Sequence, residues 1–117
     1  MAITAITVNG SEPGNIFPAM ILGSAAAATG DDVTIFFTPG GAPVMVKGEL
    51  EKIKGKGMPD IVELYEGIRI LGGKILVCEL AIGAEDIKAE DFREGVEIVG
   101  ATTFLTSVTD ASITFSF

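Results

Sequence analysis

The sequence predicts a single-domain α/β protein, a three-layer sandwich with a mainly parallel five-stranded sheet. Continuous apolar runs at Val33–Phe37 and Ile75–Val77 are typical of strands that are covered on both faces. Segments with helical spacing of apolar residues alternate with such runs, and this alternation is typical of βαβ units. No repeat or linker-like segment divides the 117 residues, so we expect one domain over residues 1–117.

A strand, a helix and a second strand follow one another at the start of the chain. Residues 3–8 are a β-prone run that ends in turn formers at 9–11. A helix is predicted over residues 16–29, and Gly30 ends it. The second strand is Val33–Phe37. The apolar residues at helical spacing in the predicted helix are Phe17, Met20, Ile21, Ala25 and Ala28.

The middle of the chain is less regular. The turn at residues 38–41 breaks the second strand, and residues 42–58 are ambiguous, since Val44–Val46 fits either a short helix or a strand. A clear helix over residues 60–71 ends at Gly72-Gly73. Its apolar stripe comprises Ile61, Leu64, Tyr65, Ile68 and Leu71, with Glu63, Glu66 and Arg69 outside it.

Five short elements complete the chain. Lys74–Cys78 is a third strand, helical turns fill residues 80–94, and Val96–Val99 is a fourth strand. A helix over residues 101–109 precedes an edge strand at 113–117 with one buried face. We expect Gly83 and Gly95 to end the helical turns, and the inward side chains to be Phe104, Leu105, Val108, Ile113, Phe115 and Phe117.

The composition excludes several classes of function. With 8 basic against 16 acidic residues, the net charge of −8 makes nucleic acid or an anionic membrane surface an unfavourable partner. The chain has no His, which excludes Ser-His-Asp and Cys-His catalysis and His-zinc sites within it. Its single Cys excludes an internal disulfide. Since no two carboxylates are convincingly placed for a metal, we predict neither a metal site nor a cofactor.

An uncharged stretch at residues 13–30 is a candidate membrane segment. Its apolar part, Ile16–Ala28, is shorter than the roughly 20 residues that a spanning helix needs, so a buried helix is the better interpretation. The beginning of the sequence has no basic region of the kind that precedes an export signal. Together with the free thiol, this predicts a cytoplasmic protein.

Ligands of parallel α/β sheets bind at the carboxyl ends of the strands. Cys78 stands at such an end and is the only soft nucleophile of the chain. A helical turn after it would direct backbone N–H groups at the sulfur and favour the thiolate. In contrast, cysteine often simply fills core space, and the neighbouring Glu79 disfavours a thiolate. Both interpretations of Cys78, reactive thiol and core residue, stay open at this point.

The strand ends also define candidate ligand-binding residues. Four ends are expected: Asn9-Gly10, Thr38–Gly41, Cys78-Glu79 and Gly100–Thr102, and the first two are Gly-containing turns that could cradle phosphate. Neither Gly-containing turn has the spacing of a Walker motif or of G-x-G-x-x-G, so each also fits a plain strand-to-helix turn. The candidates are Asn9, Gly10, Gly40 and Gly41 in the first two turns, and Ala81 and Ile82 after Cys78.

A cluster of lysines at residues 47–56 has two interpretations: a solvated face, or a basic lid over an anionic ligand or a thiolate. Three glycines between residues 48 and 57, with few anchoring apolar residues, predict that residues 40–58 are the most mobile part of the domain. In a closed lid, Lys54 or Lys56 would bring a positive charge to Cys78.

Taken together, the elements resemble the DsrE/DsrF-like family, which includes TusD-type sulfur-relay subunits, over nearly the whole chain. The resemblance rests on Ile75-Leu76-Val77-Cys78, the following Gly83, and Gly95–Phe104 leading into Ala111–Phe117. In that family a cysteine after the third strand carries a persulfide in sulfur transfer, and the resemblance implies this role for Cys78. It also implies a small cytoplasmic subunit that forms trimers or hexamers.

Two functions therefore stand beside each other. The first is a sulfur-relay protein, a persulfide sulfurtransferase or carrier that holds sulfane sulfur on Cys78 between a donor and an acceptor protein. The second is a non-catalytic assembly or small-ligand-binding subunit in which Cys78 is structural.

The helix at residues 16–29 independently predicts a homo-oligomer, for which the resemblance implies a trimer or a hexamer. It carries no charged side chain, whereas the helix at residues 60–71 turns Glu63, Glu66 and Arg69 to water. Burial between the sheet and a second subunit explains the difference. A mean hydropathy of +0.50 agrees with a homo-oligomer, because obligate interfaces between subunits are more apolar than transient ones.

Overall fold

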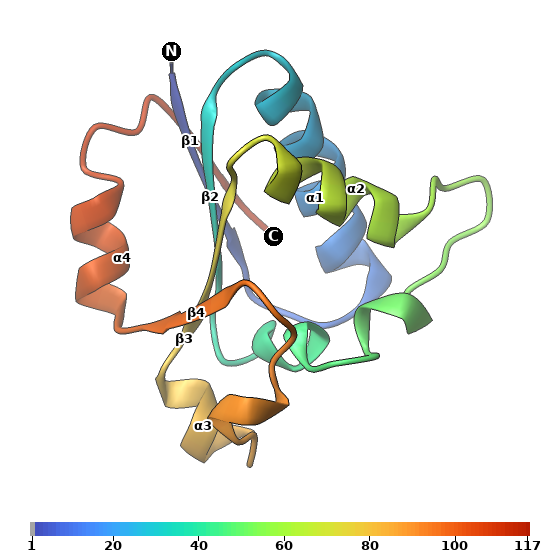
Figure 1. The fold of residues 1–117 in the computed structure, drawn as a ribbon, viewed down its shortest axis with the longest axis vertical. Coiled ribbons are helices and arrows are strands. Elements are labelled where there is room, and N and C mark those ends of the chain that lie inside the picture. Colours follow the sequence, from blue (N-terminus) through green and yellow to red (C-terminus); the bar gives the residue numbers. More distant parts are fainter. Residues whose placement is uncertain (1) are drawn as a thin grey trace.

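The computed structural model describes residues 2–117 and contains one sheet of five parallel strands in the order β4-β3-β2-β1-β5 (Figure 1). The predicted α/β class and five-stranded sheet are confirmed, and the sheet is entirely parallel. Strands β4 and β5 form its two edges. The strands are β1 (Ile3–Val8), β2 (Asp32–Phe37), β3 (Lys74–Cys78), β4 (Val96–Val99) and β5 (Ile113–Ser116).

Helices cover the two faces of the sheet unequally (Figure 1). The long helices α1 (Pro13–Ala28) and α2 (Ile61–Ile70) lie on one face, which we call the two-helix face. The short helix α4 (Ala101–Ser107) lies on the other, the one-helix face. Helix α3 (Leu80–Ala84) follows β3 at the carboxyl end of the sheet. Three 3₁₀ helices are η1 (Ala42–Met45), η2 (Leu50–Lys52) and η3 (Ala89–Asp91).

Alternation of side chains along the strands divides the core in two. The larger core lies on the two-helix face, where Ile6, Ile35 and Val77 meet side chains of α1 and α2. The smaller core lies on the one-helix face and consists of Ala5, Phe36, Leu76, Cys78 and Phe104. Phe104 is the only buried residue of α4, and its ring stacks on Phe36 with centroids 4.4 Å apart and planes 7° from parallel. This stack attaches α4 to the sheet.

Helix α1 begins at Pro13, three residues before its predicted start. Proline fits the first helical position because it lacks the N–H that has no partner there. The Asn15 side chain also accepts a hydrogen bond from the Glu12 N–H at 3.1 Å, which caps this end.

The predicted buried stripe of α1 is wrong in part. The exposed residues include Ile21, Ala25 and Ala28, and the buried ones are Ile16, Phe17, Ala19, Met20, Gly23 and Ala27. The helix has no charged face, so the spacing of its apolar residues could not indicate which side meets the sheet.

The ambiguous residues 42–58 form η1, η2 and an exposed loop. The side chains of Val44, Met45 and Leu50 are buried in the larger core, and Val46 pairs with Phe92 in an isolated antiparallel bridge. The expectation of few anchoring apolar residues is therefore wrong for residues 42–50. The expectation of few anchoring apolar residues is correct for the following loop at residues 53–60, where no residue is buried.

Three apolar side chains that were expected to point inward are exposed: Leu71 by 58%, Leu105 by 63% and Ile113 by 40%. Leu105 follows the buried Phe104, and one helical step of about 100° turns it away from the sheet. Ile113 begins an edge strand that has only β1 as a neighbour. Gly83, expected to end a helical turn, lies inside α3. Within residues 2–117, no helix combines the length and the hydropathy required to cross a bilayer.

A buried tyrosine joins α2 to the segment that leads into β4. The guanidinium carbons of Arg93 and Arg69 lie 4.9 and 5.9 Å from the centroid of the Tyr65 ring. Arg93 also donates a hydrogen bond to Glu51 Oε1 at 3.1 Å, which holds the pKa of Glu51 below its ordinary value. The Tyr65 hydroxyl is buried without a hydrogen-bond partner among residues 2–117, and burial raises its pKa.

We expect Tyr65→Phe to stabilise the protein. The substitution keeps the ring and both arginine contacts and removes a buried hydroxyl, whose lack of a partner costs about 1–3 kcal/mol. The free energy of unfolding, measured by urea at pH 7, should rise by about 1 kcal/mol. Tyr65→Leu, which removes the ring, should lower it. A loss of stability in Tyr65→Phe would show that the hydroxyl has a partner in solution, such as a buried water molecule.

Candidate functional site

Side chains tie together the carboxyl ends of β1, β2 and β5. Thr38 Oγ1 donates a hydrogen bond to Asn9 Oδ1 at 3.0 Å, and Asn9 Nδ2 donates one to Ser116 Oγ at 2.9 Å. Asn9 therefore lies at the predicted edge of the sheet. Both polar ends of its side-chain amide are engaged within the protein.

The two glycine-containing turns pack directly against each other. A Cβ atom on Gly40 would lie 2.4 Å from the Asn9 carbonyl oxygen, and one on Gly41 would lie 2.4 Å from that of Val8. Such contacts leave no room for a side chain. The structure thus brings Asn9, Gly10, Gly40 and Gly41 together as predicted, and the glycines permit the close approach of the turns.

A cavity of about 390 Å³ lies beside these turns, between Ser11, η1 and the segment Glu85–Ile87. Its walls are mostly apolar, and Lys52, which pairs with Glu49 at 3.0 Å, lies at its border. Sequence reasoning missed this cavity because several of its wall residues come from the ambiguous segment 42–58.

Cys78 is the last residue of β3, and its side chain lies on the one-helix face with Leu76 and Phe104. It is only 4% exposed. The crevice that was predicted at Cys78 is therefore closed in this structure. The cavity of about 390 Å³ and a second one of about 610 Å³ both have other residues as their walls.

The residues directly after Cys78 have surroundings that differ from those of its side chain. The Glu79 N–H donates to the Val99 carbonyl at 2.9 Å and so continues the ladder between β3 and β4. Ala81 is buried in the larger core, on the two-helix face, whereas Cys78 belongs to the smaller core on the other side of the sheet. Ile82 is partly exposed on α3. Ala81 therefore lies in a different core from the thiol side chain.

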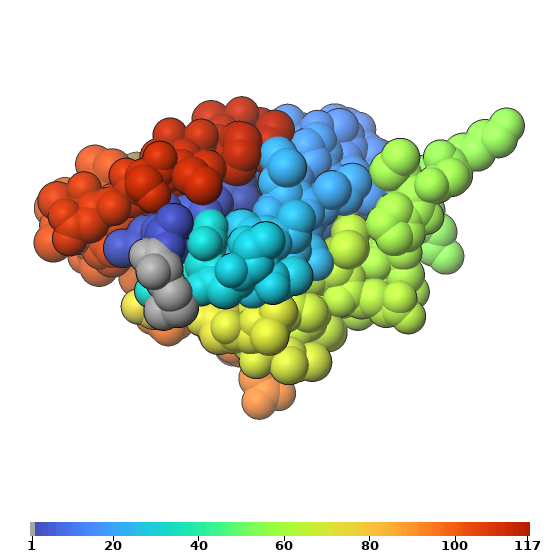
Figure 2. Space-filling view, turned by 90° about the horizontal axis from the view of Figure 1, so that it is seen from above, coloured from blue at the N-terminus to red at the C-terminus, as the bar shows by residue number. Residues whose placement is uncertain are grey.

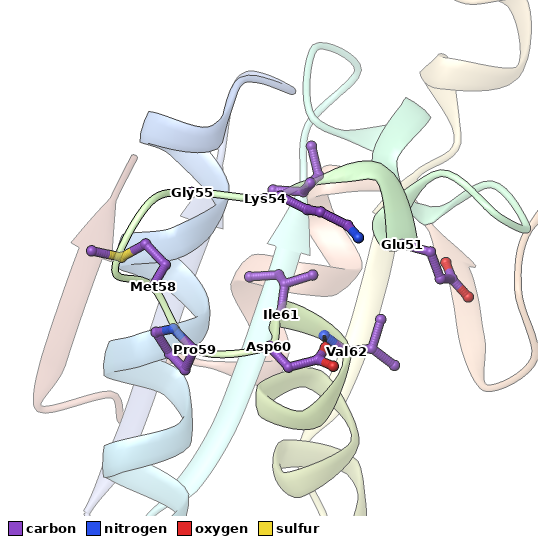
Figure 3. A pocket seen from close by; sticks show the side chains of 9 residues that line it. Glu51, Lys54, Gly55, Met58, Pro59, Asp60, Ile61 and Val62 are labelled. Atoms are coloured by element: carbon purple, nitrogen blue, oxygen red, sulfur yellow. Dashed lines mark hydrogen bonds between the residues drawn. The ribbon is translucent and has the colours of Figure 1, made fainter.

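The lysine-containing loop borders the second cavity, of about 610 Å³, at the beginning of α2. Figure 3 shows the Lys54 side chain extending over this cavity, with the carboxylates of Glu51 and Asp60 at its border. Asp60 also accepts a hydrogen bond from the Val62 N–H at 2.9 Å and caps α2.

This loop does not cover Cys78. A Cβ atom on Gly55 would lie 3.1 Å from Phe17 Cε2, which places the loop against α1 on the two-helix face. The Cys78 side chain lies on the one-helix face, so the sheet separates it from Lys54 and Lys56. Figure 1 likewise shows the loop at the right, away from α3 at the bottom. The expectation of a basic lid over the thiol is wrong.

Phe104 is the neighbour of Cys78 that sequence reasoning did not identify. The helical pattern indicated that its side chain points inward, but not where along the sheet α4 lies. The stack on Phe36 fixes that place and puts the ring in the same small core as the thiol.

Solved structures share this fold. The YchN protein of E. coli matches with a TM-score of 0.80 at 19% identity, over 100% of both chains. A protein of unknown function, MTH1491 of Methanobacterium thermoautotrophicum, matches with a TM-score of 0.71 at 13% identity, over 98% of this chain and 97% of the other.

Two relatives are similar in sequence. The uncharacterized protein MJ0760 of Methanocaldococcus jannaschii is 40% identical over 72 residues, which are 62% of this chain and 26% of that protein. The chain thus spans about a quarter of that relative. The sulfur carrier protein DsrE2 of Allochromatium vinosum is 26% identical over 128 aligned positions, covering 75% of this chain and 80% of that protein. Residues 2–117 match the model of one family throughout, and the chain belongs to the DsrE/DsrF-like family.

Proposed function

We propose that the protein is a sulfur carrier that holds sulfane sulfur as a persulfide on Cys78. The main support is the position of this cysteine at the carboxyl end of β3 in a member of the DsrE/DsrF-like family. A relative with 26% identity is named a sulfur carrier protein. Cys78 is also the only thiol of the chain, so any persulfide on this chain must form there.

The transfer consists of two thiol exchange steps. The Cys78 thiolate attacks the outer sulfur of a donor persulfide, the S–S bond of the donor breaks, and the donor leaves as a thiolate. The product is Cys78 with one added sulfur atom. An acceptor thiolate then attacks that outer sulfur, and Cys78 leaves as the thiolate. Electrons balance without an external oxidant, because each step exchanges one S–S bond for another.

Both steps require access to a side chain that is 4% exposed. It shares its small core with Phe104, the only buried residue of helix α4. An element with so few buried contacts is expected to open at a lower free energy than the whole domain. We therefore infer that local displacement of α4 exposes Cys78 to the donor and the acceptor.

The burial of Cys78 also favours a second candidate, a non-catalytic assembly or small-ligand-binding subunit. In that case Cys78 packs as a small apolar residue, and a ligand binds in the cavity of about 390 Å³ at the carboxyl ends of the strands. Reactivity of the thiol distinguishes the two candidates.

Persulfide loading tests the carrier. We expect intact-protein mass spectrometry, after incubation with a low-molecular-weight persulfide donor, to show a gain of one sulfur atom that dithiothreitol removes. Cys78→Ser is nearly isosteric, so it should fold normally and show no gain. If the wild-type thiol alkylates only in denaturant and takes up no sulfur when folded, the second candidate is correct.

The route of access is tested by Phe104→Leu. This substitution removes the ring stack and part of the apolar contact, worth about 1 kcal/mol, so the open population should increase about fivefold. The rate of Cys78 alkylation by iodoacetamide should rise by that factor under native conditions.

Two variants control this measurement. Thr103→Ala changes an exposed residue of the same helix and should leave the alkylation rate unchanged. Phe17→Leu removes a ring from the larger core on the other face of the sheet. An equal acceleration in Phe17→Leu would mean that the thiol is exposed by global unfolding and not by displacement of α4.

We also propose that the protein is a homo-oligomer, a trimer or a hexamer, held in part by the outer surface of α1. That surface includes the exposed Ile21, Ala25 and Ala28, and the whole helix lacks charged residues. An exposed helix without charge in a chain of net charge −8 fits contact with another subunit better than contact with water.

Light scattering at low micromolar concentration measures the mass of the assembly in solution. We expect a mass that is a multiple of 12.1 kDa and a smaller mass for Ala25→Glu, because the added carboxylate would have to be buried. Ala89→Glu adds the same charge at an exposed alanine of η3 and should leave the mass unchanged. A wild-type mass of 12.1 kDa would refute the oligomer.

A further inference from the structure

A groove of about 350 Å³ lies beside α4 on the one-helix face, above β1 and β5. Ala5, Thr7 and Thr114 belong to the strands that form its floor, and Leu105 and Val108 belong to its wall. The hydroxyls of Thr7 and Ser116 are 2.7 Å apart and hydrogen-bond to each other, so the polar groups of the floor are satisfied within the chain. Its lining includes no charged residue.

The surface around the groove is also uncharged. In residues 98–117 only Asp110 carries a charge, although the chain has 16 acidic and 8 basic residues. The outer residues of α4 are alanine, threonine, serine and leucine. A short helix that faced only water would ordinarily carry charged residues.

Leu105 is the most prominent apolar side chain of this surface. It is 63% exposed and lies on the wall of the groove, where nothing else in residues 2–117 covers it. The groove and an exposed leucine thus lie side by side on one face. A surface that carries both a projecting side chain and a recess can be complementary to itself across a twofold axis.

The neighbouring edge of the sheet is open. Phe117 N donates to the Thr7 carbonyl at 2.9 Å, and Asn9 N donates to the Phe117 carbonyl at 2.7 Å. Because parallel ladders alternate, the N–H and C=O groups of Thr114 and Ser116 point away from β1. Free edges are normally protected by charged residues or proline, and β5 has neither, whereas the opposite edge strand β4 carries Glu97.

We propose that this α4–β5 surface is an interface to a second copy of the chain, with Leu105 of each copy entering the groove of the other. Charge selects the occupant. Copies of a chain with net charge −8 repel each other, and they can associate most easily where both surfaces are uncharged. The α4–β5 surface meets this condition on both sides of a twofold contact.

This interface is separate from the one proposed on α1. Helix α1 covers the two-helix face, and the groove lies on the opposite face of the sheet. Figure 2 shows the C-terminal residues and α1 as distinct, adjoining parts of the surface. Two separate contact surfaces allow a closed assembly larger than either contact alone would build. The inference goes beyond the proposed function and does not depend on the chemistry of Cys78.

The test is the mass of two variants by light scattering. Leu105→Glu places a carboxylate in the groove of the neighbour, and Thr114→Lys places a charge at the floor and the open edge. We expect both to reduce the wild-type assembly to a smaller one, at least twofold lower in mass, while circular dichroism shows that they are folded. Ala89→Glu, outside both surfaces, should keep the wild-type mass.

The pattern across variants separates the two interfaces. If Leu105→Glu and Thr114→Lys both fold and keep the wild-type mass while Ala25→Glu lowers it, the α4–β5 interface is refuted and the α1 interface stands. If only the α4–β5 variants lower the mass, the α1 interface is refuted and this one stands. A wild-type mass of 12.1 kDa refutes both.

Discussion

A parallel sheet has to be covered on both faces, and this chain covers its two faces very unequally. The two-helix face receives α1 and α2, of 16 and 10 residues, while the one-helix face receives α4, of 7 residues. The stack of Phe104 on Phe36 and the partly buried Val108 hold α4 against this face. The thin cover over Cys78, the groove beside α4 and the open edge at β5 all follow from this shortage of helical cover on one face.

Strands were the part of the fold that the sequence predicted best. The bounds of β1, β3 and β4 agree with their predicted residues. Short β-prone apolar runs between turn formers leave little choice of where a strand begins and ends. It was harder to predict which side of each helix packs against the sheet. On α2, Glu63 and Arg69 identify the solvent side, whereas α1 is uncharged all round and gives no such indication. The same holds for α4, in which Phe104 is the only buried residue and Leu105 was wrongly expected to point inward.

The sequence predicted which strand ends meet, but not the surroundings of Cys78. The parallel order of the strands brought Asn9 and Gly40 together at the carboxyl edge, as expected. The face on which Cys78 lies depends on alternation, which puts Val77 in the larger core and Cys78 in the smaller one. A strand that is apolar on both faces hides this alternation, so sequence reasoning could place Lys54 near the thiol. The sheet in fact lies between them.

Under the proposed function, access to Cys78 depends on the short helix α4. The inner residue of α4, Phe104, shares the small core with Cys78, and its outer residue, Leu105, is exposed. A neighbour that binds the outer side when α4 is in place stabilises that state and must be displaced before the helix can open. Under the proposed function, a short helix with one buried residue would therefore govern whether the buried thiol can react.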